Sequence, residues 1–295
     1  MKRWLVLGLV LGLGLLPLQA QGTERGLAAY PDGAENFFAG AFPPPGFYFQ
    51  YYFLYYNAPL IRGAVPPESH GELVANVLRL TYSTKVQVLG ANWGINLIIP
   101  LVYAGTHLAP LPVSDYQFGV GNIAFDPFLL AWHLGEYHIT TGFDIIFPGT
   151  YSRNNLASPS QNYFTFQPVL GLGWMPKWGL GVNIKMMYDF PTNNTNPILG
   201  LDHYHSGQAF HFDYCVDYAV MPNLRLGAAG FYYIQTTPDT MDGVRIGNQG
   251  RQFAIGPAIK YDYRRWSFCF IPQFEMATLN RPEGQRYWVR AWYAF

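Results

Sequence analysis

The stretch from Gln285 to Phe295 reads QRYWVRAWYAF, and it ends the chain with the pattern of a β-strand. Arg286 and Arg290 occupy one face. Apolar and aromatic residues occupy the other face, at Tyr287, Val289, Ala291, Tyr293 and Phe295. An alternating strand that closes on an aromatic residue is typical of bacterial outer-membrane β-barrels, whose strands contact lipid on one face and the lumen on the other. We therefore expect outer-membrane lipid as a partner, and recognition of the strand ending in Phe295 by the barrel-insertion machinery.

The amino terminus has the pattern of a secretory signal peptide. Lys2 and Arg3 form a positive segment, an apolar run follows from Trp4 to Leu16, and a small residue stands at Ala20. The run is too short to cross a bilayer as a helix. We predict a signal peptide over residues 1–20, cleaved after Ala20, and a mature protein in the outer membrane of a Gram-negative-type bacterium.

Composition excludes several classes of protein. Loss of residues 1–20 leaves 275 residues, with 16 basic and 18 acidic side chains. No basic surface is available to attract nucleic acid. No apolar run after Leu16 approaches the ~20 residues of a transmembrane helix, so a helical membrane protein is excluded. Aromatic residues make up 18% of the chain, more than a soluble core needs.

Alternation of apolar and polar residues recurs along the mature chain and breaks in two ways. Tight breaks fall at residues 90–92, 133–136, 176–177, 222–223 and 264–265. Long polar breaks fall at residues 58–71, 105–116, 149–161, 191–207, 237–250 and 279–284. Short and long connections alternate strictly along the chain, which is typical of the periplasmic turns and extracellular loops of a membrane barrel.

The breaks divide the chain into twelve predicted strands: 46–57, 72–89, 92–104, 117–132, 137–148, 162–175, 178–190, 208–221, 224–236, 251–263, 266–278 and 285–295. The predicted fold is all-β, a transmembrane antiparallel up-and-down barrel over residues 46–295. An even number of strands puts both termini on the periplasmic side. Cys215 and Cys269 then lie three strands apart, beyond the ~7 Å that a disulfide allows between Cα atoms. We expect free thiols.

The segment 178–190 illustrates the two faces. Trp178, Val182 and Tyr188 belong to its apolar face, and Lys185 and Asp189 to its polar face. In lipid the apolar face points outward and the lumen receives the polar one. Most tryptophans cluster near predicted turns or the carboxyl terminus, which favours a girdle at the membrane boundary over ordinary core packing: Trp93, Trp132, Trp174, Trp178, Trp266 and Trp292.

Residues 21–45 lie between the signal peptide and the first strand, and they end in a proline-rich run at Phe42–Gly46. Proline stiffens the chain and removes ladder donors. The segment is therefore either a periplasmic tail or a plug that enters the lumen.

Residues 33–58 read GAENFFAGAFPPPGFYFQYYFLYYNA, and Arg79–Tyr82 and Ile99–Leu101 carry further short motifs. These stretches resemble a bacterial outer-membrane family named for the meta-pathway of phenol degradation, which is related to sphingosine-induced outer-membrane proteins. The resemblance runs through the mature chain. It implies a membrane β-barrel that transports hydrophobic or aromatic small molecules. It brings no catalytic residues and no particular substrate.

Alternation assigns a mixed set of charged side chains to the lumen. The predicted lumen-lining residues are Arg79, Lys85, Asp126, Asp144, Lys185, Asp189, Asp213, Asp217, Lys260, Asp262, Glu275, Arg286 and Arg290, with Arg225 beside them. A basic residue on the lipid face at mid-bilayer would cost about 2–4 kcal/mol. Such charges either pair with each other and rigidify a narrow barrel or form a polar wall that guides solute. We expect both, the first more than the second.

The sequence does not favour two other kinds of site. Asp202, His203 and His205, followed by His211 and Asp213, contain suitable metal ligands. The first group falls in a predicted loop with no third ligand in register, so we expect a polar rim and no metal. An outer-membrane lipid hydrolase would need a serine and a histidine aimed from one strand. Adjacent His203, His205 and Ser206 lack that spacing.

We therefore predict an outer-membrane porin or transporter, without enzymatic activity or cofactor, for passive uptake of small hydrophobic or aromatic solutes. The lumen or a lateral gap in the wall would pass the solute inward. A lipid hydrolase and a sealed structural barrel remain the alternatives.

Overall fold

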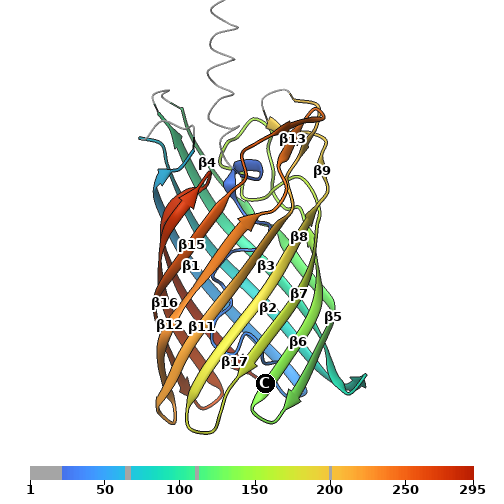
Figure 1. Cartoon of the computed structure of the whole chain (residues 1–295), viewed down its shortest axis with the longest axis vertical. Helices are drawn as coiled ribbons and strands as arrows, with labels where there is room; N and C mark the ends of the chain where they lie inside the picture. The colour runs from blue at the N-terminus through green and yellow to red at the C-terminus, as the bar shows by residue number, and fades with distance from the viewer. Residues whose placement is uncertain (1–21, 64–67, 110–112, 199–200) are drawn as a thin grey trace, which may run out of the picture.

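The computed structural model describes residues 22–63, 68–109, 113–198 and 201–295, and the predicted signal peptide lies outside them. The chain forms a closed antiparallel β-barrel (Figure 1). Closure comes from the first and last barrel strands, because β1 (Gly46–Ile61) pairs with β17 (Pro282–Ala294) from Tyr48↔Ala294 onward. The outer-membrane barrel fold predicted from alternation is confirmed.

Twelve wall positions follow one another around the barrel in chain order, and each position pairs with the next. After β1 they are β2 (His70–Val88), β3 (Ala91–Leu108), β4 (Val113–Val120) with β5 (Ile123–Leu134), β6 (Tyr137–Phe147), β7 (Thr165–Trp174), β8 (Leu180–Pro191), β11 (Ala209–Met221), β12 (Leu224–Gln235), β15 (Arg251–Tyr263), β16 (Trp266–Leu279) and β17. β4 and β5 share one position because both pair with β3.

Several strands are longer than predicted at the end of the barrel that carries the long connections. The β1–β2 ladder continues to Ala58↔Gly71, and the β2–β3 ladder reaches His70↔His107. The predicted loops 58–71 and 105–116 therefore shrink to residues 62–69 and 109–112. The predicted strands ended where polar side chains replace the apolar alternation. The observed strands continue further, because a hairpin ladder pairs its backbone N–H and C=O groups in water as well as in lipid.

The two ends of the barrel differ, and we call them the turn end and the loop end. At the loop end, residues 191–207 and 237–250 contribute a second, small sheet of β9 (Asn193–Asn194), β10 (Tyr204–His205), β13 (Asp239–Met241) and β14 (Val244–Ile246). This cap sheet lies above the barrel wall (Figure 1). It was expected to be loop, because strands of two or three residues leave no periodicity to detect.

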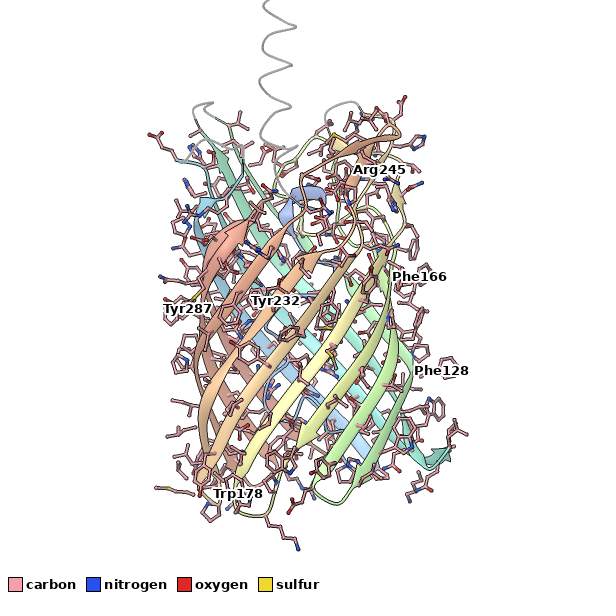
Figure 2. The ribbon with its side chains drawn as sticks, viewed as in Figure 1. Phe128, Phe166, Trp178, Tyr232, Arg245 and Tyr287 are labelled. Carbon is pink, nitrogen blue, oxygen red and sulfur yellow. The ribbon has the colours of Figure 1, made fainter. Side chains whose placement is uncertain are left out.

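The outer face of the barrel is apolar and the inner face is polar. Phe128 and Phe166 point away from the wall, and Trp178 lies at the turn end (Figure 2). In β17 the inward side chains include Arg286, Trp288 and Arg290, and the outward face carries the aromatic residues that alternate with them. Cys215 and Cys269 are free and buried.

Residues 22–45 run inside the barrel from the loop end to the turn end, and we call them the inner segment (Figure 1). At the loop end Gly22 N donates to Asn280 O over 2.7 Å, and a short 3-10 helix, η1, spans Glu24–Gly26. At the turn end Ser83 Oγ donates to Pro43 O over 2.9 Å. In the described ranges no helix is long and apolar enough to cross a membrane.

This course corrects one expectation. Both termini were placed on the side of the tight turns, and Phe295 is indeed there, where its amide donates to Phe47 O. The first described residues instead lie among the long loops. The reason is that the strand count fixes only where β1 begins, whereas the inner segment crosses the barrel once more before reaching it.

Candidate functional site: the barrel lumen

The predicted lumen residues lie inside the barrel with few exceptions. Arg79 and Lys185 keep only 11% of their side chains exposed. The others that are buried are Asp126, Asp144, Asp189, Asp213, Asp217, Lys260, Glu275, Arg286 and Arg290. Most cations have a carboxylate partner: Glu275 for Arg286 at 2.6 Å, Asp217 for Arg225 and Asp262 for Lys260. Charges that are paired in this way hold neighbouring strands of a narrow barrel together, and they attract solute less than free charges would.

Lys85 and Asp262 depart from the predicted pattern. Lys85 is exposed, because the β2–β3 register shifts between Ser83 and Gln87 and breaks the strict alternation on which its inward assignment depended. Two consecutive residues, Ser83 and Thr84, are buried at the shift, as expected for a bulge. Asp262 lies near the β15–β16 turn and keeps 41% of its side chain exposed.

Asp213 holds the backbone of the inner segment in the middle of the lumen. Its two carboxylate oxygens accept hydrogen bonds from Gly33 N at 2.7 Å and Glu35 N at 2.8 Å. Gly33 has φ +79°, a conformation that glycine adopts without strain, and a Cβ there would meet the Gln273 amide at 2.1 Å. A glycine is therefore required where the segment crosses β11 and β16.

Glu35 is the main ionic contact between the inner segment and the wall. Its Oε1 lies 2.6 Å from Arg79 Nη1 on β2 and 3.5 Å from Lys185 Nζ on β8, and it accepts a 2.6 Å hydrogen bond from the Tyr30 hydroxyl. The two strands stand on different sides of the barrel. One carboxylate of the segment therefore links distant parts of the wall through charge-assisted contacts, which are stronger than neutral ones.

Asp32 makes a second ionic contact closer to the loop end. Arg281 Nη2 lies 2.7 Å from its Oδ2, and His211 Nδ1 lies 3.0 Å from its Oδ1. His211 also lies 3.5 Å from Asp189, and the guanidinium of Arg281 stacks 3.6 Å from the Tyr233 ring centroid. Arg281 falls in a predicted loop and the sequence presents His211 only as a potential metal ligand, so alternation does not predict this cluster.

The inner segment also packs closely against the β7 wall. A Cβ on Gly40 would lie 2.1 Å from the backbone carbon of Leu172, and one on Gly171 would lie 2.8 Å from Ala39 O. Only glycines allow two backbones to approach this far. The glycines of β7 thus admit the inner segment.

At the loop end, Glu24 fastens η1 to the loops. Asn194 Nδ2 donates to both of its carboxylate oxygens, at 2.8 and 3.0 Å, and Glu24 N donates to Ser206 Oγ at 3.1 Å. Burial raises the pKa of the Glu24 carboxyl above its ordinary value. The first residues of the segment are thereby tied to the 191–207 loop.

Asp239 organises the cap sheet. It accepts hydrogen bonds from Tyr204 OH at 2.5 Å, Gly207 N at 2.6 Å, Asn248 Nδ2 at 2.8 Å and the Gln235 amide. Burial is also the main cause that raises the pKa of the Asp239 carboxyl. One buried carboxyl therefore joins the loops 191–207 and 237–250.

Small cavities line one side of the inner segment. One of about 110 Å³ has apolar walls at Leu54, Leu73, Ala75, Val77, Val102 and Trp288. Cavities of about 70 and 30 Å³ share lining residues with it toward the loop end and toward the barrel centre, respectively. A more polar cavity of about 80 Å³ at the turn end contains Asp126, Asp144 and Arg290. The interior thus has an apolar side, against β1–β3, that alternation of charges did not reveal.

The wall beside these cavities is interrupted between β4 and β5, at Gly121 and Asn122. In the described ranges β4 has a strand partner on only one edge, β3. The loop of residues 149–161 borders its other edge by isolated contacts, including Leu156 N to Asp115 Oδ2 at 2.9 Å and Ser158 Oγ to Gln117 Oε1 at 3.1 Å. Gly121 and Asn122 also line the 110 Å³ cavity.

The residues weighed for metal binding and hydrolysis lie apart. His211 and Asp213 are in the lumen, whereas His203 is exposed in a loop. Among the described residues no group of three or more His, Cys, Asp or Glu side chains is arranged to hold a metal ion. Ser206 Oγ contacts Glu24 N and, at 2.9 Å, the Tyr163 hydroxyl.

Comparison with known proteins gives one family and a set of similar folds. The model of the family described as "Putative MetA-pathway of phenol degradation" matches residues 60–291. No curated protein matches the sequence. An outer membrane channel from Pseudomonas putida F1 superposes with TM-score 0.78 at 12% identity, over 86% of this chain and 97% of that one.

Two autotransporter structures are similar at a lower level. The translocator domain of NalP from Neisseria meningitidis has TM-score 0.52 at 10% identity, with 86% of this chain and 90% of that chain covered. The β domain of the Bordetella autotransporter Brka has TM-score 0.51 at 10% identity, with 85% and 100% covered. At these identities the likeness concerns the fold alone.

Proposed function

The chain belongs to the family named for the MetA-pathway of phenol degradation, and from this premise we propose that it is a passive outer-membrane channel for small hydrophobic or aromatic molecules. The mature protein starts after Ala20 and inserts through its last strand. The tight turns face the periplasm and the long loops face the medium. The apolar outer face and the tryptophans near the turns support this orientation.

The observation that carries the proposal is the row of apolar cavities beside the inner segment. A water-filled porin needs a continuous polar channel, whereas here the inner segment occupies the lumen and its Asp32 and Glu35 pair with basic residues of the wall. The spaces that remain beside β1–β3 are small and largely apolar. They suit a hydrophobic solute, which has few hydrogen bonds with water to lose when it enters the cavity.

The interruption at Gly121 and Asn122 suggests the route. A solute in the apolar cavity has only the 149–161 loop between it and the lipid at this point, because no ladder of backbone hydrogen bonds seals the second edge of β4. Opening requires the loss of one backbone hydrogen bond, Thr150 N to Val120 O at 2.7 Å, and of a few side-chain contacts. The hydrophobic solute then leaves the lumen sideways and never crosses the polar turn end.

Acyl hydrolysis has no comparable support. Ser206 is buried, and its hydrogen-bond partners among the described residues are a backbone amide and a tyrosine hydroxyl, with no histidine among them. A sealed structural barrel is the remaining alternative, and an uptake experiment separates it from the channel.

The test measures entry of a hydrophobic dye, such as N-phenylnaphthylamine, into cells that express the protein. Gln117→Cys with Ser158→Cys allows the 149–161 loop to be bonded to β4, and formation of the bond is verified by its reversal with a reductant. We expect the bonded protein to lose most of the uptake and reduction to restore it. The matched control is His70→Cys with His107→Cys, which joins residues already paired in a ladder and leaves uptake unchanged. Uptake equal to that of cells lacking the protein would refute the channel.

A further inference from the structure

Arg25 is a buried cation that makes no ion pair within 4 Å in the described part of the chain. It is 8% exposed. Its Nη1 and Nη2 donate only to backbone oxygens, Ser160 O at 3.3 Å and Ser152 O at 3.4 Å, and its guanidinium lies 4.8 Å from the Tyr151 ring centroid. Its buried Nε has no hydrogen-bond partner. Buried guanidinium groups are normally paired, because an unpaired one loses its hydration.

The backbone at Arg25 is held in an unfavourable conformation as well. Its φ is +66°, in the left-handed region that non-glycine residues seldom adopt. Strain of this kind persists only where the surroundings impose it, and it gathers at ligand sites. The adjacent carboxyl, Glu24, makes no ion pair with it within 4 Å among the described residues and is bound instead to Asn194 and Ser206.

Arg25 lines two of the apolar cavities, those of about 110 and 70 Å³. A dry apolar cavity of about 150 Å³ holds one benzene ring, so these adjoining spaces match a single ring or a short acyl chain in size. The other cations of the larger cavity are already engaged, Arg281 with Asp32 and Arg286 with Glu275. Arg25 therefore supplies, at the edge of an apolar space, a positive charge that makes no ion pair among the described residues, and the Glu24 carboxyl acts on it only from beyond 4 Å.

A second buried arginine helps to locate the site. Arg290 also lacks a carboxylate within 4 Å among the described residues, and its Nη2 contacts Cys269 Sγ at 3.3 Å. Its cavity is more polar, and it is lined by Glu35, Asp126 and Asp144 together with Arg79 and Lys185. The larger cavity at Arg25 is also lined by two carboxylates, Glu24 and Asp32, but Asp32 is paired with Arg281 and most of the lining is apolar. The cavities at Arg25 therefore suit an apolar anion better.

We propose that the lumen binds a small apolar monocarboxylate, with its carboxylate on the Arg25 guanidinium and its ring or acyl chain between the inner segment and the β1–β3 wall. The site refines the proposed uptake function, on which it rests for the delivery of the ligand. A planar guanidinium suits a carboxylate because it offers parallel N–H donors. The channel thus selects, among hydrophobic molecules, those that carry one negative charge.

The test is isothermal titration calorimetry of the mature, full-length protein in a neutral detergent, with benzoate, benzyl alcohol and acetate as probes. Benzoate has both an aromatic ring and a negative charge, whereas benzyl alcohol has only the ring and acetate has only the charge. We expect benzoate to bind roughly 10- to 100-fold more tightly than either, the range expected for charge-assisted hydrogen bonds in a buried site. Equal binding of benzoate and benzyl alcohol, equal binding of benzoate and acetate, or no binding of benzoate would each overturn the proposal without any variant.

Substitution locates the site. Arg25→Gln should remove the preference for benzoate over benzyl alcohol, and Arg25→Lys should retain part of it. Arg153→Gln is the matched control, because Arg153 is exposed on the neighbouring loop and donates to Asn196 Oδ1 at 3.0 Å. Heat-modifiable migration in gels confirms folding of each variant. An unchanged preference in folded Arg25→Gln would overturn the site.

The two proposals fail in different ways. Dye uptake by cells together with absent benzoate binding overturns the anion site and leaves the channel. Benzoate binding without any dye uptake overturns the channel and leaves a binding barrel.

Discussion

Replacing Glu35 by glutamine should release the inner segment from the wall. The substitution keeps the shape of the side chain but removes the charge that Arg79 meets at 2.6 Å and Lys185 at 3.5 Å. Breaking a buried ion pair by removing one partner costs about 3–5 kcal/mol, and the glutamine oxygen recovers about 1 kcal/mol as a neutral acceptor. We therefore expect a loss of about 3 kcal/mol in docking free energy.

Such a loss raises the population of the undocked segment by about 10²-fold, since 1.4 kcal/mol corresponds to a factor of ten. Hydrogen exchange with mass spectrometry on peptides that cover residues 30–42 measures this population directly. We expect exchange to accelerate by a factor of that order within these peptides, while the β7 and β8 ladders stay protected. Glu72→Gln is the control, because Glu72 is exposed on β2. Unchanged exchange in Glu35→Gln would refute the reasoning that this carboxylate anchors the segment.

Three further outcomes are expected. Burial raises the pKa of both Glu24 and Asp239, so their protonated forms favour the folded cap; this contribution is present at low pH and is lost as the pH rises through the raised values. Amide exchange in residues 192–207 and 237–250, corrected for its intrinsic pH dependence, should be slower at pH 5 than at pH 7.5, and faster exchange at pH 5 would contradict this. Ser206→Ala should not change the amount of lipid that is hydrolysed in the presence of the protein. Lipid hydrolysis that is lost on removal of the Ser206 hydroxyl would instead support the hydrolase. Lys85→Gln should change the free energy of unfolding by less than about 0.5 kcal/mol, as expected for an exposed site; a larger loss would place Lys85 inside.

The wall of the barrel was predictable because its signal is local. In β8, Val182 and Phe190 face outward and Asn183 and Asp189 face inward, as period-2 alternation requires. The prediction failed at Lys85 for a local reason too, because a bulge inverts the two faces beyond it without any mark in the residue pattern.

The position of the inner segment was not predictable from periodicity. Its anchors join residues far apart in the chain, such as Asp32 with Arg281 and Glu35 with Arg79. Three acidic residues in a short segment without alternation, Glu24 among them, are consistent with a segment that meets basic residues of the wall, but they would equally suit a solvated tail. The apolar side of the lumen was missed for a related reason, because small residues such as Ala75 face inward there and lower the contrast between the two faces.

Single-channel conductance in a planar bilayer tests the central claim most directly, by comparing the mature protein with a variant that lacks residues 22–45. The inner segment fills the lumen through paired charges, and the spaces beside it are small. We predict almost no steady conductance from the full mature chain and a stable, open pore from the shortened one. A large, steady conductance that is the same in both would contradict the account, because it would mean that the segment leaves an open aqueous path and that the protein is an ordinary porin.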